Sequence, residues 1–260
     1  MNRIEKSFHQ LKVRNEKAFV PYIMAGDGGL KSLMERILFL EKSGATAIEI
    51  GIPFSDPVAD GPTIQEAGIR ALKNGTTLKE VLSTIRELRP IVSIPLILMT
   101  YMNPIYAYGI GSFILDAKKS GVDGLIIPDL PIEEEEMILE PLNEASIELI
   151  RLVTLTSPID RIKDIAERGR GFLYAVTVTG ITGSRTSFNE SVGEYLAKIV
   201  DVSPIPVLAG FGISTPEQVK EMAQYCDGVV VGSKVVELFH NGSLDKIEEL
   251  ISASKVTNVI

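Results

Sequence analysis

The chain has 260 residues, of which 45% are hydrophobic, and its formal net charge is −8. This length and composition fit a globular protein with a full core, large enough for one α/β barrel, which typically needs roughly 250 residues. The acidic balance argues against a nucleic-acid or anionic-membrane partner, because both need a basic face on the protein.

The N-terminal segment, residues 2–13, has the pattern of a helix that precedes the first strand. The start of the chain mixes charges and has no apolar stretch of the kind found in secretory signal peptides. The single cysteine, Cys226, excludes an internal disulfide, and low cysteine use is typical of the reducing cytosol. We therefore expect a cytoplasmic protein in which Cys226 is a small apolar filler just before a strand.

Short apolar runs recur along the chain, and their starts lie roughly 22 to 34 residues apart, the length of a βα unit. Most runs are continuous rather than alternating, as expected for parallel strands that are covered on both faces. The predicted strands are residues 19–25, 47–51, 96–101, 124–128, 148–155, 172–178, 206–210 and 228–231.

Residues with helical spacing fill the intervals between these runs. Two clear apolar stripes are Leu30, Leu33, Met34, Ile37 and Leu38, and Leu78, Val81, Leu82, Ile85 and Leu88. Thr215 and Gln218 have the spacing of a capping box, with Pro216 at the first helical position. Eight strands with intervening helices predict a (β/α)8 TIM barrel, formed by one domain over residues 1–260, with the extra N-terminal helix covering its bottom. A doubly wound open sheet is the alternative.

Residues 91–115 contain no charged side chain, which is a length that could span a membrane. The stretch also contains Pro95, Pro104, Gly109 and Gly111, which interrupt a continuous helix. A barrel strand, a loop and the start of a helix explain it better than a membrane span.

The second predicted strand carries an acid, Glu49, between Ile48 and Ile50. Side chains alternate along a strand, so Glu49 faces the barrel axis if the two isoleucines face the covering helices. Burial of a carboxylate is costly unless the group is paired or performs chemistry, and it raises the pKa toward neutrality. A proton donor or acceptor and a structural, hydrogen-bonded glutamate are both compatible with this strand.

The loop that follows, residues 52–62, contains three prolines and two acids, Asp56 and Asp60. The chemistry of a barrel lies at the C-terminal ends of its strands and in the loops after them. Asp60 can return over the strand end toward Glu49, whereas Asp56 stands before a proline and can be a simple turn former.

The run from Ile48 to Gln65, IEIGIPFSDPVADGPTIQ, resembles the signature of the tryptophan synthase alpha subunit family. Further similar segments follow in the family's order over nearly the whole chain, including residues 25–27, 100–104, 128–131, 210–213 and 232–233. The resemblance implies a carbon–carbon lyase of tryptophan biosynthesis. Its reaction would be the retro-aldol cleavage of indole-3-glycerol phosphate to indole and glyceraldehyde 3-phosphate.

The resemblance also implies roles for the two acids and a partner. Glu49 would protonate indole C3 and help to remove the proton of the glycerol hydroxyl. Asp60 would bind the indole N–H and stabilise positive charge on the ring. The family works without a cofactor of its own, in an α2β2 assembly with a pyridoxal-phosphate beta subunit, which Pro53 and Asp56 would contact.

A phosphate site can be argued from the residues themselves. Gly210 and Gly212 end the seventh predicted strand, and Gly232-Ser233 ends the eighth. Glycines let backbone N–H groups approach an anion, and the helix that follows Ser233 offers its N-terminal amides. The loops after strands seven and eight are the usual phosphate site of this fold. The family resemblance implies that the phosphate contacts are Gly183, Gly212, Gly232 and Ser233.

The loop after the sixth strand, residues 179–187, is rich in Gly, Ser and Thr, as expected for a lid. In the family this loop closes over the ligand, and Thr182 reaches Asp60. Tyr22, Tyr101 and Tyr174 match family positions near the substrate, although a core tyrosine with a satisfied hydroxyl is an alternative for each.

Some residues depart from the family pattern without removing a catalytic group: Gly28, Thr154, Thr177, Thr179 and Lys234. Other chemistries fit less well. A Schiff-base aldolase needs a lysine inside a strand, and the predicted strands contain none. The two histidines, His9 and His240, fall in the outer first and last helices, so we expect no metal site. A subunit that mainly activates a partner remains a further alternative.

Overall fold

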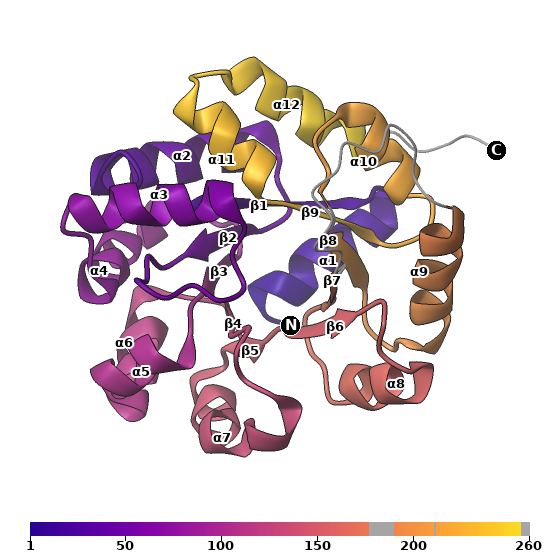
Figure 1. The fold of residues 1–260 in the computed structure, drawn as a ribbon, viewed down its shortest axis with the longest axis horizontal. Helices are drawn as coiled ribbons and strands as arrows, with labels where there is room; N and C mark the ends of the chain where they lie inside the picture. The colour runs from indigo at the N-terminus through magenta and orange to yellow at the C-terminus, as the bar shows by residue number, and fades with distance from the viewer. Residues whose placement is uncertain (177–189, 211, 256–260) are drawn as a thin grey trace.

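The computed structural model describes residues 1–176, 190–210 and 212–255, in which parallel strands form a ring surrounded by helices (Figure 1). The strands are β1 (Ala18–Met24), β2 (Ile48–Gly51), β3 (Leu96–Met99), β4 (Gly124–Ile126), β5 (Glu148–Leu149), β6 (Arg151–Thr154), β7 (Leu173–Val176), β8 (Val207–Gly210) and β9 (Gly228–Val231). The α-helices are α1 (Arg3–Arg14), α2 (Leu30–Ser43), α3 (Pro62–Lys73), α4 (Leu78–Leu88), α5 (Met102–Tyr108), α6 (Ile110–Ser120), α7 (Glu136–Ala145), α8 (Ile159–Glu167), α9 (Glu190–Val202), α10 (Pro216–Met222), α11 (Ser233–His240) and α12 (Leu244–Ala253). Two short 3-10 helices are η1 (Arg89–Ile91) and η2 (Ile132–Glu134).

The strands pair in the order β5-β4-β3-β2-β1-β9-β8-β7-β6, and every described pairing is parallel. The two ends of this order are consecutive in sequence, since only Ile150 separates β5 from β6. The Ile150 N–H donates to Leu125 O on β4, and the residues after it pair with β7. The predicted strand 148–155 is therefore two short strands, because its first half follows one neighbour and its second half the other. Together they fill one barrel position, which gives the eight positions of a (β/α)8 barrel.

Alternation along the strands divides the core into two parts. On β1, Phe19 and Ile23 pack in the layer between the strands and the helices, whereas Val20 belongs to the cluster inside the barrel. On β2, Ile48 and Ile50 both pack in the outer layer. Glu49 therefore faces the barrel axis, which is the orientation predicted from the sequence.

The N-terminal helix α1 closes the bottom of the barrel. Asn2 and Glu5 form a capping box at its start, which satisfies backbone donors that a helix N-terminus leaves free. Ile4 is fully buried and packs in the same cluster as Val20 and Phe172 inside the barrel. The predicted extra helix is confirmed, and its bounds are shifted by one residue.

Ion pairs tie the bottom of the barrel together. The buried Asp123 carboxylate lies just before β4 and accepts from Arg3 at 2.9 Å and from Arg89 at 3.2 Å. Its Oδ2 atom also accepts from the Leu96 N–H at the start of β3. Arg89 donates further to the carbonyl oxygens of Val92 and Ile94.

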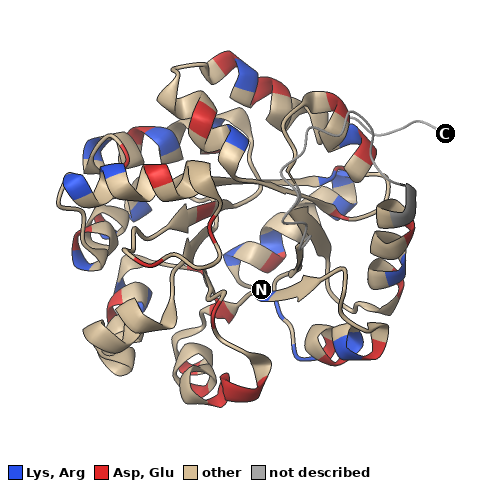
Figure 2. Ribbon diagram, viewed as in Figure 1, with Lys and Arg blue, Asp and Glu red and all other residues tan. Residues whose placement is uncertain are grey.

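The uncharged stretch 91–115 contains β3, α5 and the first part of α6. The predicted strand and helix start are confirmed, whereas the segment predicted as a loop forms the short helix α5. Within the described part of the chain, none of the helices is long and apolar enough to cross a bilayer. Acidic and basic residues are mixed along the outer ring of helices (Figure 2).

Candidate active site

A cavity of about 360 Å³ opens at the upper end of the barrel, where the strands reach their C-terminal ends. Both acids singled out in the sequence lie in it. Its described lining residues are Tyr22, Glu49, Ala59, Asp60, Gly61, Ile64, Met99, Tyr174, Gly210, Gly212, Ile213, Ser214, Val230, Gly232, Ser233, Lys234 and Glu237. This is the end of a barrel that carries the chemistry of the fold.

Glu49 lies on the floor of the cavity, on β2. The side chain is only 1% exposed, and its Oε2 atom is buried without a hydrogen-bond partner among the described residues. Burial, and then the charge of the nearby Asp60, raise the pKa of Glu49 from 4.5 to about 8. The group therefore holds its proton at neutral pH and can donate it to a bound molecule.

Asp60 lies at the end of the loop between β2 and α3, on the wall of the cavity. Burial raises the pKa of Asp60 from 3.8 to about 6, and hydrogen bonding from Tyr101 acts in the opposite direction. The carboxyl is therefore mainly ionised at neutral pH, whereas Glu49 is mainly protonated. Two neighbouring acids whose pKa values are pushed apart can act as a proton donor and a stabilising anion.

Tyr101 holds the loop that carries Asp60. Its hydroxyl accepts a hydrogen bond from the Ala59 N–H at 3.1 Å, and its ring packs on Phe54 with 5.5 Å between ring centroids. Tyr101 is not among the residues that line the described cavity, and its implied contact with the substrate stays a prediction.

Tyr22 and Tyr174, for which the family resemblance implies substrate contacts, both line the cavity. Burial, followed by the charges of nearby carboxyl groups, raises both tyrosine pKa values well above 10, so both hydroxyls are neutral donors. The two rings have room in the cavity because the residues that face them, Gly51 and Gly210, carry no side chain. A Cβ atom on Gly51 would lie 1.8 Å from the Tyr22 hydroxyl, and one on Gly210 would lie 2.1 Å from the Tyr174 ring.

The C-terminal ends of β8 and β9 give the cavity the features of an anion site. An added Cβ at Gly212 would meet no described atom within 4 Å, so the space beside its backbone is open. Helix α11 begins at Ser233, and no side chain caps its N-terminus among the described residues. The amides of this first turn, together with the partial positive charge of the helix end, can hold a phosphate.

Two predicted site residues, Thr182 and Gly183, lie outside the described residues, as do the departures Thr177 and Thr179. In the proposed partner loop, Pro53 is buried and Asp56 is exposed.

Three departures lie among the described residues, and two of them, Gly28 and Thr154, lie outside the lining of this cavity. Gly28 has a φ of +88°, which proline cannot adopt. At the end of β6, the Thr154 hydroxyl forms hydrogen bonds with the hydroxyls of Thr156 and Ser157.

The sequence analysis missed two features of the cavity wall. Lys234 had been noted only as a departure from the family pattern, and Glu237 had not been considered. Their spacing of three residues on one helix predicts an ion pair, and the Lys234 Nζ atom lies 2.9 Å from Glu237 Oε1. Apolar contacts from Ile64 and Met99 were also missed, because they depend on how α3 and β3 meet over the cavity.

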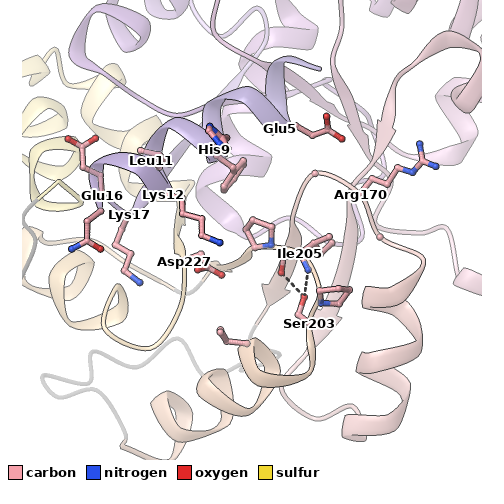
Figure 3. A pocket seen from close by; sticks show the side chains of 17 residues that line it. Glu5, His9, Leu11, Lys12, Glu16, Lys17, Arg170, Ser203, Ile205 and Asp227 are labelled. Carbon is pink, nitrogen blue, oxygen red and sulfur yellow. Dashed lines mark hydrogen bonds between the residues drawn. The ribbon is translucent and has the colours of Figure 1, made fainter. Parts of the chain in front are cut away.

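A larger cavity, of about 700 Å³, lies at the bottom of the barrel between α1 and the segments that lead into β7, β8 and β9 (Figure 3). Its charged lining includes Lys12, Lys17 and Arg170 but also Glu5, Glu16 and Asp227, so the charges balance. The Lys17 ammonium donates to Cys226 O at 2.7 Å. Cys226 is buried, and burial raises the pKa of its thiol to about 11, which agrees with a packing role.

The described residues offer no group of three or more His, Cys, Asp or Glu side chains that could hold a metal ion. His9 lies in α1, at the bottom cavity, and His240 ends α11.

Comparisons with known proteins agree on one family. The profile of the family described as "Tryptophan synthase alpha chain" matches residues 8–258. The chain is 54% identical over 255 residues to the tryptophan synthase alpha chain of Bacillus anthracis, covering 98% of this chain and 97% of that one. The corresponding Bacillus mycoides protein is 56% identical over 242 residues, covering 93% of this chain and 94% of the relative.

Solved structures show the same likeness. The tryptophan synthase alpha chain of Legionella pneumophila superposes with a TM-score of 0.90 at 32% identity, covering 100% of both chains. A Mycobacterium tuberculosis tryptophan synthase structure gives a TM-score of 0.90 at 32% identity, covering 98% of this chain and 99% of the matched chain.

Proposed function

Because the chain belongs to the tryptophan synthase alpha chain family, we propose that Glu49 and Asp60 perform the reaction of that family in the upper cavity of the barrel. The chain is a carbon–carbon lyase that cleaves indole-3-glycerol phosphate to indole and glyceraldehyde 3-phosphate in tryptophan biosynthesis. The observation that carries the assignment is the buried Glu49 carboxyl, whose Oε2 has no partner among the described residues and which faces the same cavity as Asp60.

Glu49 supplies and recovers one proton in this proposal. Its protonated carboxyl donates to indole C3, and the ring becomes a cationic indolenine. The carboxylate that remains then accepts the proton of the glycerol hydroxyl as the bond between C3 and the side chain breaks. The bonding electron pair returns to the indole ring, the hydroxyl-bearing carbon leaves as an aldehyde, and Glu49 is protonated again. A pKa of about 8 suits a group that must both give and take a proton near neutral pH.

Asp60 stabilises the cation that forms between these two transfers. Its pKa of about 6 leaves it ionised at neutral pH, so its carboxylate can accept the indole N–H and offset the developing positive charge. Tyr101 supports this role from behind, because it holds the Ala59 N–H next to Asp60. Tyr22 and Tyr174 form part of the cavity wall, and their neutral hydroxyls can donate hydrogen bonds to a bound substrate.

The phosphate lies at the C-terminal ends of β8 and β9 in this proposal, against Gly212, Gly232 and Ser233. The open space beside Gly212 and the uncapped start of α11 support it. As the family resemblance implies, Gly183 would add a contact to the phosphate, and Thr182 would contact Asp60. The closed ring of strands also supports a single domain over residues 1–260.

Membership of the family implies a beta-subunit partner. We propose an α2β2 assembly in the cytoplasm, in which the loop after β2 contacts the beta subunit. Asp56 is exposed on this loop, and the nearby Val58 is 83% exposed. The buried Pro53 would support the loop from below more than it would contact a partner.

Indole release by the isolated chain, measured with and without purified beta subunit, tests the proposal. We expect indole from indole-3-glycerol phosphate in both cases, with a higher rate in the complex. A rate that appears only with the beta subunit would favour the partner-activating alternative. A folded chain that releases no indole in either case would contradict the assignment of Glu49 and Asp60.

A further inference from the structure

Charge is unevenly distributed in the upper cavity. Among its described lining residues, the acids are Glu49, Asp60 and Glu237, and the only base is Lys234. The whole chain is also acidic, with a net charge of −8. Because Glu49 is mainly protonated at neutral pH, the charged lining residues are Asp60, Glu237 and Lys234, which leaves the cavity negative. A phosphorylated substrate must therefore enter a negative cavity on a negative protein, against a repulsion that the backbone amides near Gly212 and Gly232 offset only in part.

Lys234 lies beside the amides that would hold the phosphate. It is the second residue of α11, directly after Gly232 and Ser233, and all three residues line the cavity. Its ammonium is paired with the Glu237 carboxylate at 2.9 Å, one turn further along the helix. The Lys234 side chain is 27% exposed and the Glu237 side chain 49%, so the pair lies at the mouth of the cavity.

Lys234 can exchange the Glu237 carboxylate for another anion at little cost in free energy. Partly exposed pairs three residues apart on a helix contribute little stability, because water competes for both groups. A lysine side chain is flexible and carries its charge on a long stem. A phosphate dianion offers more charge and more acceptor oxygens than one carboxylate, and the half-exposed Glu237 can return to water.

We propose that Lys234 is a phosphate-binding side chain that leaves Glu237 and pairs with the substrate phosphate when indole-3-glycerol phosphate binds. Glu237 holds the ammonium at the cavity mouth in the free protein and competes with the phosphate for it. The inference rests on the proposed function, since it adds a residue to the proposed phosphate site. Lys234 thus favours phosphorylated over unphosphorylated ligands, and Glu237 weakens this preference.

Binding of sn-glycerol 3-phosphate and of indole, each measured as inhibition of indole-3-glycerol phosphate cleavage, tests the proposal. Lys234→Met should raise the inhibition constant of glycerol 3-phosphate about tenfold, as expected for loss of a partly solvated charge-assisted hydrogen bond. Glu237→Gln should lower this constant about threefold, because the competing carboxylate is gone. The inhibition constant of indole should stay within twofold in both variants.

The double variant, Lys234→Met with Glu237→Gln, distinguishes the exchange of Lys234 between Glu237 and the phosphate from direct repulsion of the phosphate by Glu237. If Glu237 acts by holding Lys234, Glu237→Gln should have almost no effect in the Lys234→Met background, since coupled residues are not additive. A threefold gain that persists in the double variant would show direct repulsion of the phosphate by Glu237 and would overturn the exchange.

Matched controls come from α8, where Lys163 and Glu167 form a similar helical ion pair at 3.8 Å, away from the cavity. Lys163→Met and Glu167→Gln change the net charge by the same amounts and should leave both inhibition constants unchanged. If Lys163→Met weakened glycerol 3-phosphate as much as Lys234→Met, the effect would be one of overall charge, and the proposal would be wrong.

The outcomes also separate this inference from the proposed function. A parent chain that cleaves indole-3-glycerol phosphate, together with a Lys234→Met variant that binds glycerol 3-phosphate within twofold of the parent, would overturn only the role of Lys234. Equal weakening of glycerol 3-phosphate and indole by Lys234→Met would overturn it too, because the side chain would then support the shape of the cavity. A folded parent without cleavage activity would instead contradict the proposed function itself.

Discussion

Glu49 at the upper end of the barrel and Asp123 at the lower end are both buried carboxyl groups at the ends of strands, but their surroundings differ. Asp123 receives hydrogen bonds from Arg3, Arg89 and the Leu96 N–H. Glu49 faces another acid, Asp60, and its Oε2 has no partner among the described residues. Buried charges normally require pairing, so the unpaired acid is the one that is retained for chemistry.

The cavities at the two ends repeat this contrast. The lower cavity is larger, at about 700 Å³ against about 360 Å³, yet its acidic and basic side chains balance. The upper cavity combines two acids with shifted pKa values, neutral tyrosine hydroxyls and an uncapped helix end. Size alone would select the wrong end of the barrel, whereas the chemistry of the lining residues selects the end that the fold uses for catalysis.

The largest expected effect comes from Glu49→Gln. The amide keeps the shape of the side chain but cannot give or take the proton, so kcat should fall by about 10²–10⁴-fold, the usual contribution of a general acid–base group. Circular dichroism should show a normally folded protein. Steady-state indole release measures the change, and a kcat within threefold of the parent would rule Glu49 out as the proton donor.

The corresponding acid-to-amide change at the lower end of the barrel, Asp123→Asn, should lower stability and leave kcat nearly unchanged. Asp123→Asn leaves the buried Arg89 without its counter-charge, which typically costs about 3 kcal/mol or more of unfolding free energy. The kcat of the folded variant should stay within twofold of the parent. Urea unfolding gives the stability, and indole release at a temperature where the variant is folded gives the activity. A stable Asp123→Asn protein with low kcat would contradict the division between the two ends.

The stability of the protein should depend on pH through the two acids of the upper cavity. The folded pKa of Glu49 is about 8, and its ordinary value is 4.5. Between these values the folded chain retains a proton that the unfolded chain has lost, so this group makes stability fall as the pH rises. Asp60 acts with the same sign between 3.8 and about 6.

Glu49→Gln removes the larger of these two contributions. Relative to the parent, the variant should therefore gain stability by at most about 1.4 kcal/mol for each pH unit between about pH 5 and pH 8. Urea unfolding of both proteins across this range measures the gain. A difference that stays constant with pH would mean that Glu49 has an unshifted pKa in the folded protein.

The smallest expected effect lies in the lower cavity. Lys12 lines it on α1, far from the strand ends that carry the acids. Lys12→Met should change kcat/KM for indole-3-glycerol phosphate by less than twofold, because surface substitutions away from a site usually have small effects. A large decrease would give the lower cavity a role in the reaction that its balanced charges do not suggest.

Local patterns in the sequence predicted most of the fold and the core of the site. The period of two along 47–51 predicted an inward Glu49, and the glycines at the ends of the last two strands predicted an anion site. Contacts between distant segments could not be predicted in this way. The Tyr101 hydroxyl accepts from the N–H of Ala59, 42 residues away, only because the loop after β2 passes over the end of β3. The division of 148–155 depends on how two neighbouring strands meet at Ile150, which no local pattern records.

The central claim is that Glu49 holds its proton at neutral pH because it is buried, beside Asp60, with an oxygen that has no hydrogen-bond partner among the described residues. The most direct test is a pH titration of the Glu49 carboxyl carbon by NMR in protein labelled with ¹³C-glutamate, with the resonance assigned by its loss in Glu49→Gln. The account predicts a midpoint near 8, which should move to lower pH in Asp60→Asn as the neighbouring charge is removed. A midpoint near the ordinary value of 4.5, unchanged in Asp60→Asn, would contradict it.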